Sequence, residues 1–190
     1  MEILDVLQRV ISKLEELRLP YMVSGSAASS FYAFVRTTQD GDMVVALGQD
    51  QVENFAAAFA PEFYLDRASI RRALQMGGSF NLIHLESSLK IDFFPLRARR
   101  FSHEEFSRRQ PRLILNKSIA PAYVATAEDT ILSKLEWFRA GGEVSENQWK
   151  DVLGILKVQA GNLDLAYLNH WARELHVEDL FEKAFKEANK

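Results

Sequence analysis

A run of five apolar residues at positions 43–47 constrains the fold of this chain more than any other feature. A strand with one face in solvent alternates apolar and polar residues, whereas a strand covered on both faces is apolar nearly throughout. The run therefore predicts a strand over residues 42–47 that is covered on both faces. A helix over residues 51–59 is expected to follow it, with Asp50 as its N-cap.

The rest of the chain divides into a strand-rich part and a helical part. The first part predicts a helix over 3–18, a strand over 21–24, a helix over 26–34, a short strand over 63–65, a helix over 67–75 and a hairpin of 80–85 with 89–96. From Thr126 the spacing is helical, with helices over 126–139, 145–159, 164–174 and 178–188. We expect a mixed α/β (α+β) domain over 1–125 and a C-terminal helical segment over 126–190 packed on it.

Composition excludes several classes of function. The 190 residues contain no cysteine, so disulfides, thiolate metal sites and cysteine nucleophiles are ruled out. The formal net charge is −3, which gives no overall field that attracts nucleic acid. The N-terminus is acidic and amphipathic, unlike a signal peptide, and no apolar run approaches the ~20 residues that span a membrane. The sequence predicts a cytoplasmic protein without a membrane partner.

Gly25-Ser26 lies where the predicted strand over 21–24 meets a helix. The first N–H groups of a helix have no backbone partner and suit a phosphate, and glycine lets an anion approach the backbone. Turns of this kind are also common without any ligand. Gly25 and Ser26 are therefore candidate phosphate-binding residues only in combination with other features.

Three aspartates supply those features. Asp40 and Asp42 flank Gly41 at the entry to the apolar run, and residues two apart on a strand point to the same side. Two carboxylates on one side favour a hard divalent cation between them, although Asp-Gly is also a turn signal. Asp92 lies inside the apolar segment 89–94, where a carboxylate needs a partner or a metal unless it faces solvent. If the two strands are neighbours, the three carboxylates converge beside Gly25.

The segment from Gly25-Ser26 through Arg36-x-Thr38-x-Asp40-x-Asp42 to Asp92 resembles the polymerase-beta-type nucleotidyltransferase superfamily. It is closest to small prokaryotic members, some of them abortive-infection or toxin-like proteins paired with an antitoxin. The resemblance covers about residues 20–96 and extends more weakly to Lys134, Arg139, Gln148 and Asp151. It departs at Gly41, where the superfamily usually has an aliphatic residue. Glycine weakens strand geometry, so a degenerate, non-catalytic member is one reading.

The resemblance implies a nucleotidyltransferase-like mixed sheet flanked by helices and a role for each matching residue. Asp40, Asp42 and Asp92 would be the catalytic residues and would bind Mg²⁺ or Mn²⁺. Gly25, Ser26 and Arg36 would contact the NTP. Lys134 and Asp151 would also contact nucleotide, with a surface salt bridge as the alternative for these two.

The expected activity is Mg²⁺-dependent transfer of NMP from NTP to a hydroxyl on an RNA 3′ end, a protein or a small molecule. An antitoxin partner is a further expectation. The alternative is a non-catalytic nucleotidyltransferase-like protein with a binding or regulatory role. The basic stretch 97–117 could bind triphosphate or RNA, or could be a solvated surface. The tryptophans at 137, 149 and 171 lie in amphipathic helices and are expected to pack in the core.

Overall fold

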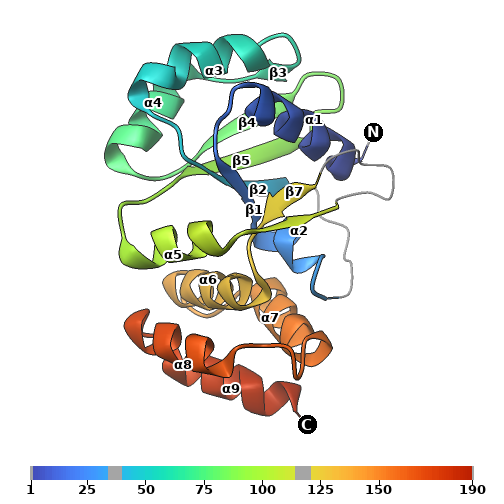
Figure 1. The fold of residues 1–190 in the computed structure, drawn as a ribbon, viewed down its shortest axis with the longest axis vertical. Helices are drawn as coiled ribbons and strands as arrows, with labels where there is room; N and C mark the ends of the chain where they lie inside the picture. The colour runs from blue at the N-terminus through green and yellow to red at the C-terminus, as the bar shows by residue number, and fades with distance from the viewer. Residues whose placement is uncertain (1, 34–39, 114–120, 190) are drawn as a thin grey trace. The chain divides into compact units, whose positions relative to one another are not determined.

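The computed structural model describes residues 2–33, 40–113 and 121–189. Within these ranges the chain forms a mixed sheet in the order β3-β4-β5-β2-β1-β7-β6 together with helices (Figure 1). The strands are β1 Tyr21–Ser24, β2 Asp40–Val45, β3 Phe63–Tyr64, β4 Phe80–His84, β5 Lys90–Pro95, β6 Gln110–Arg112 and β7 Ala122–Val124. The helices are α1 Ile3–Glu16, α2 Gly25–Ser29, α3 Val52–Phe59, α4 Arg67–Met76, α5 Arg100–Arg108, α6 Ala127–Ala140, α7 Glu146–Val158, α8 Leu165–Glu174 and α9 Glu178–Ala188. The predicted mixed α/β class is confirmed.

The chain divides into two compact units. Unit 1 comprises Met1–Ala27 and Thr37–Val124 and contains the sheet, whereas unit 2 comprises Ala28–Arg36 and Ala125–Lys190. The sequence places a boundary near residue 125, and the units differ from that division in the segment that begins at Ala28. The Tyr32 hydroxyl donates to the Ala125 carbonyl at 2.8 Å, and the Gln159 amide donates to the Tyr32 carbonyl at 3.1 Å. These bonds tie the segment to the C-terminal helices of unit 2.

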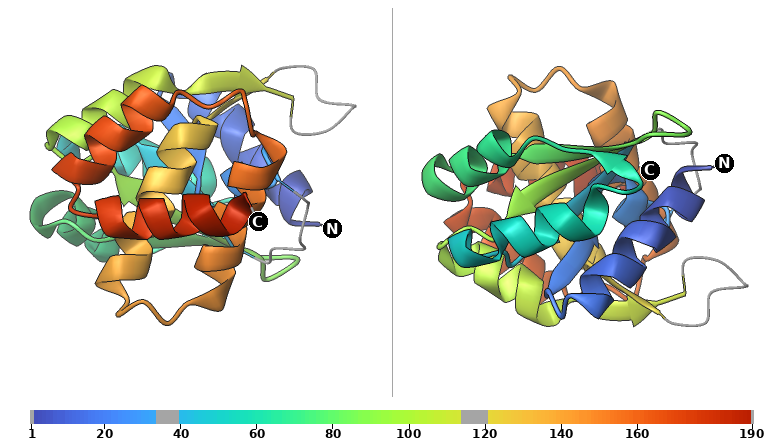
Figure 2. Two further views of the ribbon diagram at one scale, coloured as in Figure 1. Left: turned by 90° about the horizontal axis from the view of Figure 1, so that it is seen from below. Right: turned by 90° about the horizontal axis from the view of Figure 1, so that it is seen from above.

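In unit 1 the apolar face of the sheet is covered by α1, α3 and α4, which lie together on that face (Figure 2, right). The residues of β2 alternate, with Gly41, Met43 and Val45 buried on this side. Aromatic rings fill the space under α3: Phe55 packs edge-to-face on Phe93 with centroids 5.8 Å apart. Because alternate residues face opposite ways, Asp40 and Asp42 lie on the other face of the sheet.

Unit 2 is a layer of helices in which α6 packs on α7 and α8, and α9 packs on α7 and α8. Ile131 and Leu135 of α6 and Val152 and Ile155 of α7 are fully buried, as helical periodicity predicts. The tryptophans differ from the expectation of a common core role. Trp171 is 5% exposed, but Trp137 is 49% exposed, so core packing is wrong for Trp137. An amphipathic pattern does not decide how much of a large ring at its margin is covered.

Two local expectations are wrong. The helix predicted over 26–34 ends at Ser29, where Tyr32 N–H and Ala33 N–H both donate to the Ser29 carbonyl and the chain turns. Asp50 is not the N-cap of α3, because a 3₁₀ turn over Gln49–Gln51 precedes the helix and Gln51 takes the cap position. Thr126 is the N-cap of α6 and accepts from Asp129 N–H at 3.1 Å. No helix in the described ranges is long and apolar enough to cross a membrane.

Candidate active site

Strand pairing in unit 1 brings the aspartates of β2 and β5 to opposing positions. The two strands run parallel, with Asp42 opposite Asp92 and Asp40 opposite Lys90. Opposed residues of paired strands project to the same face, and so do residues two apart on one strand. Asp40, Asp42 and Asp92, which we call the carboxylate cluster, therefore share the face opposite Met43 and Phe93. The parallel register places the three acids together although 50 residues separate Asp42 from Asp92 in sequence.

Gly25 lies directly against this cluster. β1 pairs antiparallel with β2 and places Ser24 opposite Asp42, so the turn that follows begins beside the Asp42 carboxylate. Gly25 has a φ of +57°, and a Cβ at this position would lie 2.0 Å from Asp42 Oδ2. Both the backbone conformation and the close approach of the carboxylate require glycine here. The turn at Gly25 and the aspartates of β2 are thus in direct contact, which neither sequence motif indicates by itself.

Lys90 is a component of the site that the sequence reasoning missed. Its ammonium lies 2.8 Å from Asp92 Oδ2 and 4.0 Å from Asp40 Oδ1. The pKa of Lys90 is raised, chiefly by the hydrogen bond to Asp92 and then by the negative charges of Asp92, Asp40 and Asp42, while partial burial opposes the rise. A signal was present in the sequence: Lys90 is two residues before Asp92 on a strand, and so must share its face.

The donor chemistry of the cluster fits a hard divalent cation, since all three side chains offer carboxylate oxygens from neighbouring strands. As the side chains stand, however, no three His, Asp or Glu residues in 2–33, 40–113 and 121–189 lie close enough to share one metal ion. Within the cluster, Asp92 is turned to the Lys90 ammonium. A protein cation therefore neutralises part of the charge that a metal ion would neutralise.

Gly41, the departure from the superfamily pattern, is accommodated without a gap. It is the buried second residue of β2, paired with Ile91 of β5. A Cβ at Gly41 would lie 2.6 Å from Ile91 Cδ1, so the Ile91 side chain fills the space that an aliphatic residue would take. The strand keeps its register with β5 through Gly41, and the two flanking aspartates keep their common face.

Four further residues are predicted to contact the nucleotide. Lys134 and Asp151 belong to unit 2, where Nζ donates to Oδ2 at 2.8 Å and joins α6 to α7. Their side chains are 7% and 9% exposed, so the pair is buried and is not the surface salt bridge of the alternative reading. Ser26 lies in α2 next to Gly25. Arg36 lies outside the described residues.

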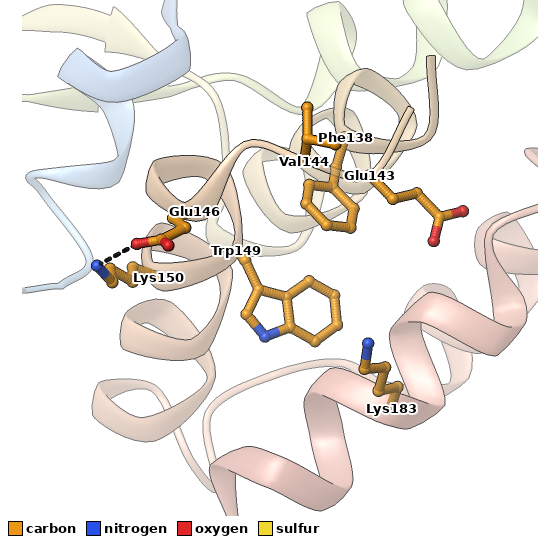
Figure 3. A pocket seen from close by; sticks show the side chains of 7 residues that line it. All are labelled: Phe138, Glu143, Val144, Glu146, Trp149, Lys150 and Lys183. Atoms are coloured by element: carbon orange, nitrogen blue, oxygen red, sulfur yellow. Dashed lines mark hydrogen bonds and ion pairs between the residues drawn. The ribbon is translucent and has the colours of Figure 1, made fainter. Parts of the chain in front are cut away.

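Unit 2 also contains an open pocket of about 220 Å³, shown in Figure 3. It is lined by Phe138, Glu143, Val144, Glu146, Trp149, Lys150 and Lys183. Both of its lysines have partners: Lys150 pairs with Glu146 at 3.0 Å, and Lys183 lies 5.0 Å from the Trp149 ring centroid. Of the described residues that the sequence marks as catalytic or nucleotide-binding, none lines this pocket.

Three solved structures match nearly the whole chain. One is an antigenic nucleotidyltransferase-like protein from Paracoccidioides brasiliensis, with a TM-score of 0.57, 15% identity, and coverage of 97% of this chain and 92% of that one. The chain has a nucleotidyltransferase-like fold. The other two are structures of the antibiotic-resistance factor ANT(2″)-Ia. Its solution structure has a TM-score of 0.53 and 12% identity, and covers 98% of this chain and 94% of that one.

The crystal structure of ANT(2″)-Ia in complex with adenylyl-2″-tobramycin has a TM-score of 0.57 and 11% identity, with 91% and 96% of the two chains covered. No family model matches the sequence. No curated protein matches it either. The nucleotidyltransferase-like fold expected from the Gly25–Asp92 segment is therefore confirmed by structure. With identities of 11–15%, the similarity to these proteins is a similarity of fold.

Proposed function

We propose that this chain is a divalent-metal-dependent nucleotidyltransferase that transfers NMP from NTP to a hydroxyl acceptor and releases pyrophosphate. The observation that carries the proposal is the register of β2 and β5, which sets Asp42 opposite Asp92 beside the Gly25 turn. A nucleotidyltransferase-like fold with acids on one sheet face next to a close-approach glycine supports this chemistry better than a general binding role.

Asp40, Asp42 and Asp92 are the residues that would hold Mg²⁺ or Mn²⁺. When bound, the cations supply charge neutralisation on the attacking and leaving oxygens of the transfer. Gly25 and Ser26 would bind the outer phosphates through backbone N–H groups, next to the Asp42 carboxylate. The acceptor oxygen forms a bond to the α-phosphorus as the bond to the bridging oxygen breaks, and pyrophosphate leaves. Asp92 would accept the proton of the acceptor hydroxyl.

Arg36, Lys134 and Asp151 are nucleotide contacts by resemblance. For Lys134 and Asp151 the buried hydrogen bond between α6 and α7 already accounts for their charge. We therefore propose a structural role for this pair, with any contact to nucleotide made in addition to it.

A small-molecule hydroxyl is the acceptor to test first. This chain and ANT(2″)-Ia cover each other almost completely, and that protein has been seen with an adenylylated small molecule. The net charge of −3 also favours a small acceptor over a long RNA footprint. An RNA 3′ end or a protein side chain would be the acceptor of a toxin-like enzyme that works in the cytoplasm with an antitoxin.

The second candidate is a non-catalytic nucleotidyltransferase-like protein. The observation that favours it is the Lys90 ammonium, 2.8 Å from Asp92, together with the finding that no three acids or histidines of the described residues lie close enough to share one metal ion. Metal binding separates the two candidates, since a catalytic site must bind Mg²⁺ or Mn²⁺ together with NTP.

The test is incubation of the full chain with each α-labelled NTP, Mg²⁺ and total cell extract, followed by separation of protein, RNA and small-molecule fractions. We expect label in one fraction with wild type and none with Asp42→Asn. Asp50→Asn, which changes an exposed aspartate outside the cluster, is the matched control and should label as wild type does. Label in no fraction, with no binding of metal and NTP, would favour the non-catalytic candidate.

A further inference from the structure

We propose that Lys90 is an internal counter-ion of the carboxylate cluster, which holds the acids in place without metal and is displaced when a divalent cation binds. The inference rests on the proposed metal-dependent function and adds a regulatory element to the same site. It starts from an ion pair that the proposed chemistry does not require. A lysine that donates to Asp92 takes up an oxygen that the metal would need.

The position of Lys90 follows from the strand register and does not depend on a loop. Lys90 is the first residue of β5 and lies opposite Asp40, with Asp92 two residues further on the same face. From there its ammonium reaches Asp92 Oδ2 at 2.8 Å and Asp40 Oδ1 at 4.0 Å. It thus bridges the two strands that carry the cluster.

Lys90 lies beside more than one carboxylate. Its ammonium is 2.8 Å from Asp92 Oδ2 and 4.0 Å from Asp40 Oδ1, and Asp42 lies opposite Asp92 on the same face of the sheet. Carboxylates that share one face of neighbouring strands repel one another, so a neighbouring cation lowers the free energy of the metal-free site. A divalent cation neutralises more of this charge than an ammonium does, and it needs the same carboxylate oxygens.

The ammonium and a metal ion cannot both lie against Asp92. Like charges a few ångströms apart repel strongly even at the effective dielectric of a protein surface. Lys90 can leave easily, because its side chain is 38% exposed and the long flexible stem can carry the ammonium into solvent. The exchange therefore requires only a side-chain rotation and no change of the sheet.

If Lys90 is a counter-ion, its substitution should lower the stability of the metal-free protein and raise its affinity for a divalent cation. Without metal, Lys90→Met should melt at a lower temperature than wild type, because the carboxylates lose their cation. With Mn²⁺, the same variant should bind the ion about fivefold more tightly, because the competitor is gone. At saturating Mn²⁺ the difference in melting temperature between the two proteins should shrink, since in both of them the cation then neutralises the cluster.

The experiment is a calorimetric titration of the full chain with Mn²⁺, paired with thermal melts with and without the ion. Lys90→Gln, which keeps a hydrogen-bond donor but no charge, is the second variant in case Lys90→Met folds poorly. Lys150→Met is the matched control: it also removes one exposed lysine from an ion pair, with Glu146 at 3.0 Å. We expect its Mn²⁺ affinity to equal that of wild type.

The outcomes separate this inference from the proposed function. Equal or weaker Mn²⁺ binding by both Lys90 variants would overturn the counter-ion and leave the metal site standing. Binding by the variants but not by wild type would support it most strongly. An absence of Mn²⁺ binding in wild type and in every variant would overturn the metal-dependent function and with it the exchange.

Discussion

The ion pairs Lys134–Asp151 in unit 2 and Lys90–Asp92 in unit 1 have the same N···O distance, 2.8 Å. Their surroundings differ. The first pair has side chains 7% and 9% exposed, whereas the second has side chains 38% and 20% exposed. Lys90 also lies 4.0 Å from a second carboxylate, that of Asp40. Distance alone does not distinguish a structural pair from one that can exchange its cation. Burial and the number of neighbouring carboxylates do.

Disruption of the two pairs is expected to change the free energy of unfolding by different amounts. A buried pair that loses one partner leaves a charge in a medium of low dielectric, and this strongly destabilises the fold. A partly exposed pair that loses one partner leaves a charge that water can solvate. The pair in unit 2 is thus expected to be needed for folding, and the pair in unit 1 to be replaceable. The following predictions test that contrast.

The largest effect is expected for Lys134→Met. Removal of the ammonium leaves Asp151 buried without its cation, at a cost of about 3–5 kcal/mol in the free energy of unfolding. Urea unfolding followed by circular dichroism measures the change. Lys150→Met, in an exposed pair of the same unit, is the control and should change stability by less than about 0.5 kcal/mol. Similar losses in both variants would show that burial does not separate the pairs.

The second largest effect is expected for Gly25→Ala, which changes the residue where the turn contacts the carboxylate cluster. Its Cβ would lie 2.0 Å from Asp42 Oδ2, and φ is +57°. We expect a loss of about 3 kcal/mol and a weaker affinity for Mn²⁺, because Asp42 has to move. Gly142→Ala is the control, since its φ is +74° but its Cβ would meet nothing within 4 Å. It should cost only about 1–2 kcal/mol, for the backbone conformation. Equal losses would mean that Asp42 does not require the glycine.

A smaller effect is expected for Asp42→Asn, and only in the presence of ligand. Without metal the variant should melt at the same or a slightly higher temperature, because one of three neighbouring carboxylates becomes neutral. Mg²⁺-NTP at about 100 times its dissociation constant should stabilise wild type by about 2.7 kcal/mol and leave the variant unchanged. Thermal melts of both proteins measure this. Equal shifts in the two would place the nucleotide elsewhere, and no shift in wild type would favour the non-catalytic reading.

The smallest effect is expected at an exposed ion pair of unit 1. The pKa of Glu62 is lowered, first by the hydrogen bond from Arg9 and also by the charge of Lys13, although burial opposes the shift. A carboxyl whose pKa is lower in the folded state stabilises the fold above its unfolded pKa of about 4.3 and loses that contribution as pH falls through the folded value.

Glu62→Gln should therefore reduce stability at pH 7 by less than about 1 kcal/mol and flatten the decline in stability below about pH 5. Unfolding curves between pH 7 and pH 3 provide the measurement. A variant as steep as wild type in this range would show that other carboxyls dominate the acid response.

Much of the fold follows from local pattern. Apolar runs and helical spacing place most helices and strands of the described residues within a few positions, since burial on one or two faces sets the period. They did not predict α5, β6 or β7. The exceptions are informative. The helix after Gly25 ends early, and Tyr32 beyond its end bonds to Ala125, a partner 93 residues away. Trp137 lies on an amphipathic helix but is 49% exposed. Neither the distant contact nor this exposure can be derived from a local window of the sequence.

The same distinction holds at the candidate site. By itself the sequence determined that Asp40 and Asp42 share a side, that Gly25 allows a close approach, and that Asp92 lies on an apolar strand. Only the tertiary structure decided that β2 and β5 are parallel neighbours in a register that opposes Asp42 to Asp92. It also decided that Lys90 provides the cation beside these acids and that Ile91 fills the space at Gly41. The physical reason is that periodicity encodes the face of a residue within its own strand, whereas its neighbours across the sheet depend on strand order and register, which long-range packing sets.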